Sequence, residues 1–138
     1  MDKFTRIYSI VVGLICLAIF IVWLANFNFR VSELNDLLED DQMLADYPYQ
    51  FRVISLNNGI AKLSSPRSAA MPAITFLGII YPELKGSTAQ EPDMIRAQKD
   101  LADHQMHAKN LIVEQADVSS THWVLDRDWY VERGIYLE

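Results

Sequence analysis

The chain has 138 residues, with 12 lysines and arginines against 18 aspartates and glutamates, which gives a formal net charge of −6. This length allows one ordinary domain and little more, and the acidic balance argues against nucleic acid as a partner, because phosphate contacts need a basic face. The single cysteine excludes an intrachain disulfide framework and a multi-cysteine metal site. The common motifs of hydrolases, NTPases and dinucleotide enzymes do not occur, so we expect no enzyme activity and no cofactor or metal.

Hydrophobic residues are concentrated near the N-terminus. Residues 7–29 contain no charged side chain, and 19 of these 23 residues are apolar. About 20 apolar residues in a helix span the hydrocarbon core of a bilayer, so residues 7–27 predict a membrane-spanning helix in contact with lipid. A cleaved signal peptide is disfavoured because the run is long and lacks an A-x-A site. A lipoprotein anchor at Cys16 is disfavoured because Ile15 stands where a small residue would precede the cysteine.

The charges that flank this segment predict its orientation. Lys3 and Arg6 precede it, whereas Arg30 alone follows it closely. Flanking lysines and arginines favour the cytoplasmic side of a membrane, so we expect the N-terminus inside and the rest of the chain outside. In a bacterium this describes a single-pass inner-membrane protein with a periplasmic domain. Residues 1–30 form the predicted anchor.

Residues 31–46, called the acidic collar below, lie next to the predicted span. They contain six acidic side chains and no basic one, so their charge equals the net charge of the whole chain. Leucines at near-helical spacing predict an amphipathic helix with Ser32 as its N-cap, one face covering the outer domain and the acidic face in water. Glu39, Asp40 and Asp41 are therefore candidates for contact with a basic partner. A calcium loop would need the EF-hand pattern, which is absent.

Residues 47–138 predict a small outer domain that begins with a hairpin. Residues 49–56 and 60–64 are rich in strand formers, and Asn58-Gly59 between them is a strong signal for a type I′ turn. This turn pairs Leu56 with Ala61 and Ile54 with Leu63, which would place all four apolar side chains on one face of the sheet.

The rest of this domain predicts helices around a third strand. Pro72 and Pro82 bound a short buried helix over 72–82, for which a strand is the alternative, and a long helix follows over 92–116. Residues 118–126 form the third strand, and Asp126 and Gly134 bound a final short helix. Helices packed on one face of a three-stranded antiparallel or mixed sheet make a two-layer α+β domain.

The order of these elements, with the sequences VISLNNGIAKLSS and AKNLIVEQADVSSTHWVL, resembles the BON domain over residues 33–126. Gly59 before the second strand and Val118 at the start of the last strand carry the resemblance. It implies binding of phospholipid or another envelope component, which is the alternative to a protein-binding function. The chain departs from that family at Asp117, where glycine usually stands, in the additional stretch 72–92 and in the tail.

The chain is also similar to small single-pass proteins of proteobacteria that carry the name glutamate-ammonia-ligase adenylyltransferase. That activity would need a glycine-serine turn followed by paired metal-binding aspartates. The sequence lacks this pattern, so we do not expect the activity.

The remaining candidates are basic, aromatic or histidine side chains. Arg67, in the loop SSPRS, is a candidate for contact with an anion, and Trp129 and Tyr130 are candidates for an exposed aromatic patch, since both residue types are frequent at interface hot spots. His104 and His107 share one predicted helix, and a metal-dependent enzyme that uses them is a distant alternative. The leading hypothesis is a non-enzymatic accessory or assembly subunit of a membrane complex, whose outer domain binds a protein partner.

Overall fold

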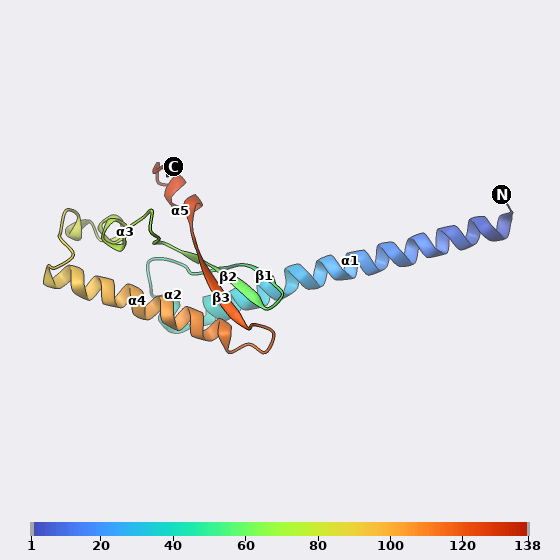
Figure 1. Cartoon of the computed structure of the whole chain (residues 1–138), viewed down its shortest axis with the longest axis horizontal. Coiled ribbons are helices and arrows are strands. Elements are labelled where there is room, and N and C mark those ends of the chain that lie inside the picture. Colours follow the sequence, from blue (N-terminus) through green and yellow to red (C-terminus); the bar gives the residue numbers. More distant parts are fainter. Residues whose placement is uncertain (1, 138) are drawn as a thin grey trace.

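A computed structural model describes residues 2–137, and the side chains of residues 26–28 lie outside the described set. The chain forms, in order, α1 (Lys3–Asp40), α2 (Gln42–Ala45), β1 (Val53–Asn57), β2 (Ile60–Ser65), α3 (Ala73–Ile80), the short 3-10 helix η1 (Pro82–Leu84), α4 (Pro92–Val113), β3 (Ser120–Leu125) and α5 (Arg127–Val131). The predicted α+β class is confirmed: a long apolar N-terminal helix precedes a small domain of helices around a three-stranded sheet (Figure 1).

The α1 helix runs without interruption from the N-terminus into the domain. Its 38 residues extend about 57 Å at about 1.5 Å per residue. The first half projects away from the domain (Figure 1) and is long and apolar enough to cross a membrane. The predicted N-cap at Ser32 is wrong, because Ser32 lies inside this helix. No glycine or proline occurs between Gly13 and Pro48, so nothing in the backbone breaks the helix at residue 31.

The second half of α1 supplies part of the domain core. Leu34 and Leu38 are fully buried, and α1 packs against β1 and α4. The helix ends at Asp40, and Asp41 accepts a hydrogen bond from the backbone N–H of Leu44 as the N-cap of α2. The acidic collar is thus two helices with a capped turn between them, and it covers the domain as predicted.

The sheet has the order β1-β2-β3 and is mixed, because β1 is antiparallel to β2 whereas β3 is parallel to β2. The connection from β2 to β3 passes through α3 and α4, as parallel pairing requires. In the hairpin turn, Asn58 and Gly59 both have positive φ, 52° and 79°, which confirms the predicted turn residues.

One predicted pair in the hairpin is wrong. Leu56 faces Ala61 as expected, but the register shifts between Val53 and Ser55, so that Val53 rather than Ile54 faces Leu63. This β-bulge reverses which side chain points inward. Val53 is 3% exposed, whereas Ile54 is 51% exposed on the other face.

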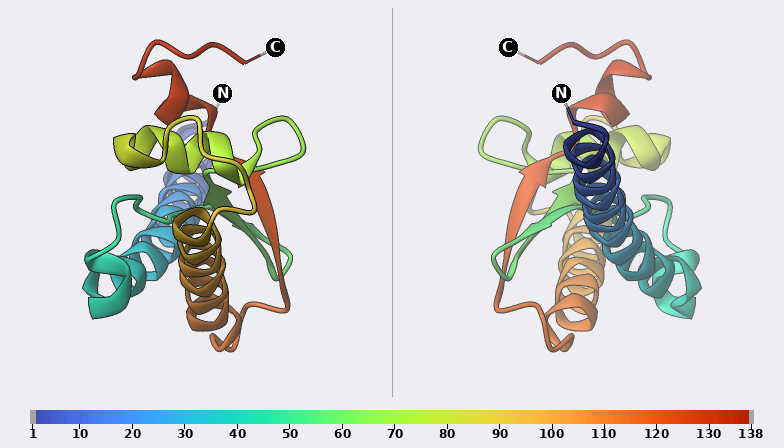
Figure 2. Two further views of the ribbon diagram at one scale, coloured as in Figure 1. Left: turned by 90° about the vertical axis from the view of Figure 1, so that its left-hand side faces the viewer. Right: turned by 90° about the vertical axis from the view of Figure 1, so that its right-hand side faces the viewer.

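The predicted helices of the domain are confirmed, with small differences at their ends. The α3 helix follows Pro72, and α4 ends at Val113, three residues before the expected end. The α5 helix is capped by Asp126, whose side chain accepts from the N–H of Trp129, and Gly134 follows it at φ 75°. Figure 2 shows that α4 and the second half of α1 lie on one side of the sheet.

The two edges of the sheet differ. At the β1 edge, the side-chain amide of Asn35 in α1 donates to the carbonyl oxygen of Val53 over 3.1 Å and accepts from the N–H of Val53 over 2.6 Å. This pair of bonds is the one that a neighbouring strand would make. At the other edge, β3 contacts β2 and α4, and no further strand of the described chain pairs with it.

Gly59 provides a test of the hairpin. A Cβ atom at this position would lie 2.6 Å from Oγ of Ser119. The substituted residue would also have to keep φ at +79°, a left-handed conformation that residues with a side chain rarely adopt. We expect Gly59→Ala to lower the free energy of unfolding by more than the ~1–2 kcal/mol that a left-handed backbone costs a non-glycine residue. Gly86→Ala is the matched control, because Gly86 has φ +84° with open space around its Cβ position. Chemical denaturation of the full chain in a non-ionic detergent measures both; equal losses would contradict the contact with Ser119.

Candidate functional site

Arg30 joins α1 to the loop between α4 and β3. Its Nε and Nη2 atoms each donate to one carboxylate oxygen of Asp117 over 2.7 Å, and Nη1 and Nη2 reach Glu33 and Gln115 over 3.3 and 3.4 Å. The two parallel bonds form the strong bidentate geometry of an arginine–carboxylate pair. The hydrogen bond with Arg30 lowers the pKa of Asp117, and it raises the pKa of Arg30. Asp117 is also the position where the sequence departs from the BON pattern.

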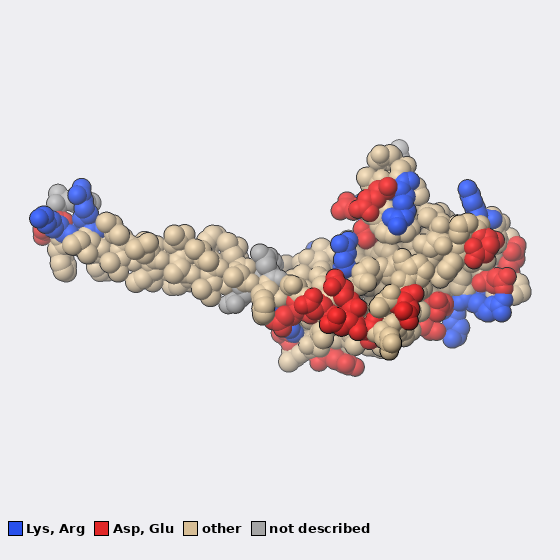
Figure 3. Space-filling model, turned by 180° about the vertical axis from the view of Figure 1, so that it is seen from behind, with Lys and Arg blue, Asp and Glu red and all other residues tan. Residues whose placement is uncertain are grey.

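The acidic side chains of the collar gather where α1 enters the domain (Figure 3). Glu39 and Asp40 are exposed, so both are accessible to a partner. The side chain of Asp41 is 19% exposed and lies 2.8 Å from Nε2 of His107. Burial alone would raise the pKa of Asp41, but the hydrogen bonds from His107 and from the N–H of Leu44 outweigh it and lower this pKa. Asp41 therefore stabilises the junction of α1, α2 and α4.

The two helical histidines have separate environments. His104 is buried against the ring of Tyr47, and its Nδ1 lies 2.7 Å from the carbonyl oxygen of Asp100. His107 faces Asp41 instead. Within residues 2–137, no three His, Cys, Asp or Glu side chains are placed to hold one metal ion.

The C-terminal aromatic candidates lie mainly in the core. Tyr130 is fully buried and its hydroxyl donates to the carbonyl oxygen of Pro66, so it is not part of an exposed patch. Trp129 is half-buried, with the guanidinium carbon of Arg133 3.7 Å from the ring centroid. The predicted aromatic patch is largely buried because Trp129 packs against Tyr49 and other rings of the core. The short helical pattern of the sequence does not indicate this packing.

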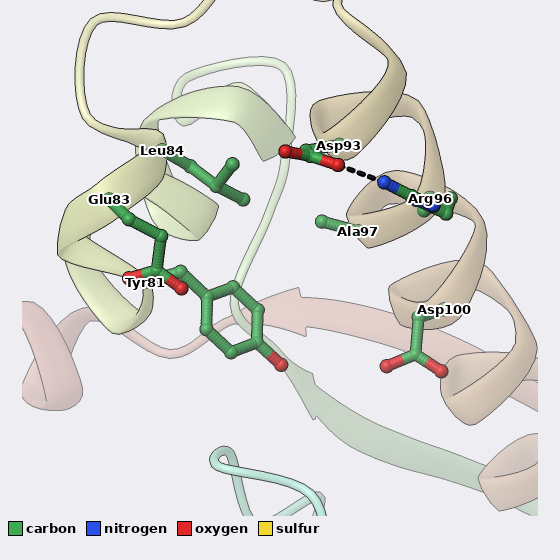
Figure 4. Close-up of a pocket in the computed structure, with 7 residues that line it drawn as sticks. All are labelled: Tyr81, Glu83, Leu84, Asp93, Arg96, Ala97 and Asp100. Atoms are coloured by element: carbon green, nitrogen blue, oxygen red, sulfur yellow. Dashed lines mark hydrogen bonds and ion pairs between the residues drawn. The ribbon is translucent and has the colours of Figure 1, made fainter.

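A pocket of about 450 Å³ lies between η1 and α4. Figure 4 shows the ring of Tyr81 lying across it, with the hydroxyl directed toward α4. Burial raises the pKa of Tyr81. The cation of this pocket, Arg96, is paired with Asp93, and Glu83 and Asp100 add further negative charge. Among its lining residues the pocket therefore offers no cation without an ion pair to a ligand.

A second pocket, of about 420 Å³, lies where the loop after β2 meets α4 and β3. Its lining combines a cation, a tryptophan and buried polar groups, and consists of Ser65, Arg67, Ser68, Ala69, Pro72, Ala73, Gln105 and Trp123. Trp123 contacts Phe51 of the core edge-on at 6.1 Å between ring centroids, yet it is 36% exposed. We call this site the Arg67–Trp123 pocket.

Arg67 is held in place by a network of buried side chains. Its Nε donates to Oε1 of Gln105 over 2.6 Å, and Nε2 of Gln105 donates to Oγ of Ser65 over 3.1 Å. Oγ of Ser65 in turn donates to the carbonyl oxygen of Arg67 and accepts from its N–H. Gln105 and Ser65 are 6% and 1% exposed, whereas Arg67 is exposed. Among residues 2–137 Arg67 forms no ion pair, so its Nη atoms can bind an anion.

The structure thus places Arg67 beside two residues that the sequence analysis did not single out as site residues. Gln105 follows Leu101 by one helical turn, on the buried stripe of α4, and a polar residue on an apolar stripe is a signal for a buried hydrogen bond. Trp123 gave no comparable signal, because its exposure depends on how far α4 extends over β3.

Comparisons with known proteins find no matching family model, no similar curated protein and no similar solved structure. The resemblance to the BON domain therefore remains an expectation from the sequence.

Asp41 gives a pH-dependent prediction. Its pKa in the folded chain is lower than in the unfolded chain, so its stabilising effect is complete above the unfolded value and is lost as the pH falls through the folded value. We expect Asp41→Asn, which can still cap α2, to make the free energy of unfolding depend less on pH below about pH 4. Unfolding of the full chain at several pH values measures this. Asp40→Asn, at an exposed neighbour, is the control; the same flattening in both variants would contradict the role of Asp41.

Proposed function

We propose that this chain is a non-enzymatic, single-pass inner-membrane protein whose periplasmic domain binds a protein partner, as an accessory or assembly subunit of a membrane complex. The observation that carries the proposal is the continuity of α1 from the apolar segment into the domain core, reinforced by the pair between Arg30 and Asp117. The charges that flank the span support a cytoplasmic N-terminus.

This connection fixes the height and orientation of the domain. Arg30 lies three residues beyond the predicted span, about 4.5 Å further along the helix axis. A flexible linker would let the domain move over many orientations, whereas a continuous helix presents the same surface to a neighbour in the same membrane. Restricting this freedom before binding reduces the entropic cost of association, which suits a protein that stays with a membrane complex.

The surface around the entry of α1 favours a protein over a lipid headgroup as the ligand. Glu33 and Asp36 face solvent at this level, and acidic side chains are repelled by anionic lipids. The BON-like alternative, a phospholipid- or envelope-binding module, would need a surface that attracts headgroups. The Arg67–Trp123 pocket is lined instead by the loop after β2, the start of α3, α4 and β3, and none of its lining residues belongs to α1.

Chemical cross-linking of the tagged full chain in membranes, followed by purification in a mild detergent and mass spectrometry, tests the proposal. We expect a specific protein in a fixed ratio to the chain, and about tenfold less of it from Arg67→Gln/Trp123→Ala, since truncation of hot-spot residues costs more than 1 kcal/mol each. Arg96→Gln/Ile95→Ala, on another surface, is the control. Recovery of the chain with lipid alone would contradict the proposal and support the BON-like alternative. A periplasmic reporter fused after residue 138 tests the orientation; reporter activity confined to the cytoplasm would contradict it.

A further inference from the structure

We propose that the open edge of β3 binds an extended segment of the partner, which adds to the sheet as a fourth strand and places an acidic side chain on Arg67. The inference rests on the proposed function, because the segment belongs to the partner. It names the binding mode and the chemistry that the partner must offer.

The hydrogen-bonding pattern shows which backbone groups of β3 are open. The N–H groups of Ser120 and Asp126 donate to the carbonyl oxygens of Gly59 and Ser65. The even-numbered residues of this stretch therefore direct their backbone N–H and C=O groups toward β2. Because successive residues of a strand alternate, Thr121, Trp123 and Leu125 direct their N–H and C=O groups to the outer edge. Among residues 2–137 none of these groups has a partner outside the sheet.

An extended peptide is the chemical complement of such an edge. A row of unpaired donors and acceptors along an edge strand is a template for another strand, and β-strand addition uses main-chain bonds for affinity and side-chain pockets for specificity. The Arg67–Trp123 pocket lies on the α4 side of this edge and contains the side chain of Trp123 itself. A segment paired with β3 would therefore have alternate side chains directed to this pocket.

Charge favours an acidic segment. The sequence of β3, STHWVL, contains no acidic residue. Arg67 has no ion pair among residues 2–137, and its guanidinium lies on the α4 side of the sheet together with the side chain of Trp123. Lys62 and His122 face each other on the opposite side of the sheet. The nearest acid in sequence, Asp126, is engaged by the N–H of Trp129 and the hydroxyl of Tyr49. A carboxylate on the α4 side of the added strand would pair with the Nη atoms of Arg67, whose Nε is held by Gln105.

A second copy of the chain does not fit this edge. A two-fold dimer through β3 would pair the strands antiparallel and reverse one domain relative to the other. Since β3 begins near the point where α1 leaves the domain and runs away from it (Figure 1), the two anchor helices would point in opposite directions. They could not lie in one bilayer, so the occupant is a segment of a different protein.

Synthetic peptides test the inference on the full chain in detergent micelles. The probe is acetyl-TVEVTVEV-amide, and the control is acetyl-TVKVTVKV-amide. We expect the acidic peptide to slow amide hydrogen exchange at Thr121, Trp123 and Leu125, and to bind at least about tenfold more tightly than the lysine peptide. Arg67→Gln should remove this preference, whereas Arg96→Gln, on another surface, should retain it. Absence of binding, equal binding of both peptides, or protection at other amides would overturn the inference.

The backbone contribution has its own matched pair of variants. Thr121→Pro removes an N–H that points to the open edge, while it leaves the bonds to β2 intact; Thr121→Val keeps that N–H. We expect binding of the acidic peptide to fall about tenfold in the first variant, as for a lost hydrogen bond, and to persist in the second. Equal binding by the two variants would overturn strand addition, and Arg67→Gln remains the decisive variant if Thr121→Pro does not fold.

The two proposals fail separately. A specific cross-linked protein that Thr121→Pro recovers as well as the unaltered chain does, and that Arg67→Gln/Trp123→Ala loses, would leave the proposed function standing and overturn the strand addition. Protection of β3 amides by the peptide, with no protein recovered from membranes, would support strand addition at this edge and contradict the proposed function.

Discussion

The bidentate pair between Arg30 and Asp117 determines how the two halves of this molecule relate. Arg30 belongs to the helix that leaves the apolar segment, and Asp117 belongs to the loop that leads into the last strand, 87 residues later. Without this contact, α1 would still meet the domain through its buried leucines and the Asn35–Val53 hydrogen bonds, but only the longer bond from Arg30 to Gln115 would link it to the loop before β3. The pair thus links the helix directly to the loop that leads into the parallel strand.

Burial decides which charges of the acidic collar are free. The sequence places six acids in a row of sixteen residues, and from the sequence they look equivalent. In the structure Asp41 is a helix cap and the partner of His107, Glu33 contributes to the Arg30 cluster, and Glu39 and Asp40 remain in water. Two neighbouring residues, Asp40 and Asp41, therefore have different roles because they stand on the two sides of a helix boundary.

Much of the fold follows from local patterns, and the exceptions have identifiable physical causes. The apolar run, the Asn58-Gly59 turn and the helix after Pro72 each depend on a few adjacent residues, and each is confirmed. The register at Ile54 failed because a bulge adds a residue on one strand, which no alternation pattern reveals. The break expected at Ser32 failed because a good N-cap residue does not end a helix whose leucines continue into a core. Trp129 and Tyr130 are candidates for an exposed patch from the sequence but lie mainly in the core, because their rings pack against distant segments, which a short pattern does not reveal.

The candidate site likewise combines one residue that local sequence identifies with two that only the tertiary structure brings to it. Arg67 was identifiable as a basic residue in a polar loop, but its neighbours Gln105 and Trp123 come from two other elements that are 38 and 56 residues away in sequence. Their proximity is a property of the crossover from β2 to β3, which brings the loop after β2, α4 and the edge strand β3 together. Local sequence can identify a cation, but the tertiary structure decides whether a buried amide orients it.

The side chain of Asn35 has a consequence for how the sheet can be extended. It forms hydrogen bonds with the N–H and the carbonyl oxygen of Val53 at the edge of β1. The sheet therefore cannot be extended there without displacing α1 from the core. A sheet with two free edges can add strands in both directions and grow into open assemblies, as aggregating edge strands do. Among the described residues this sheet can therefore be extended only at the β3 edge. The long N-terminal helix thus does more than pack against the sheet, because its Asn35 side chain also closes one of the two edges of the sheet.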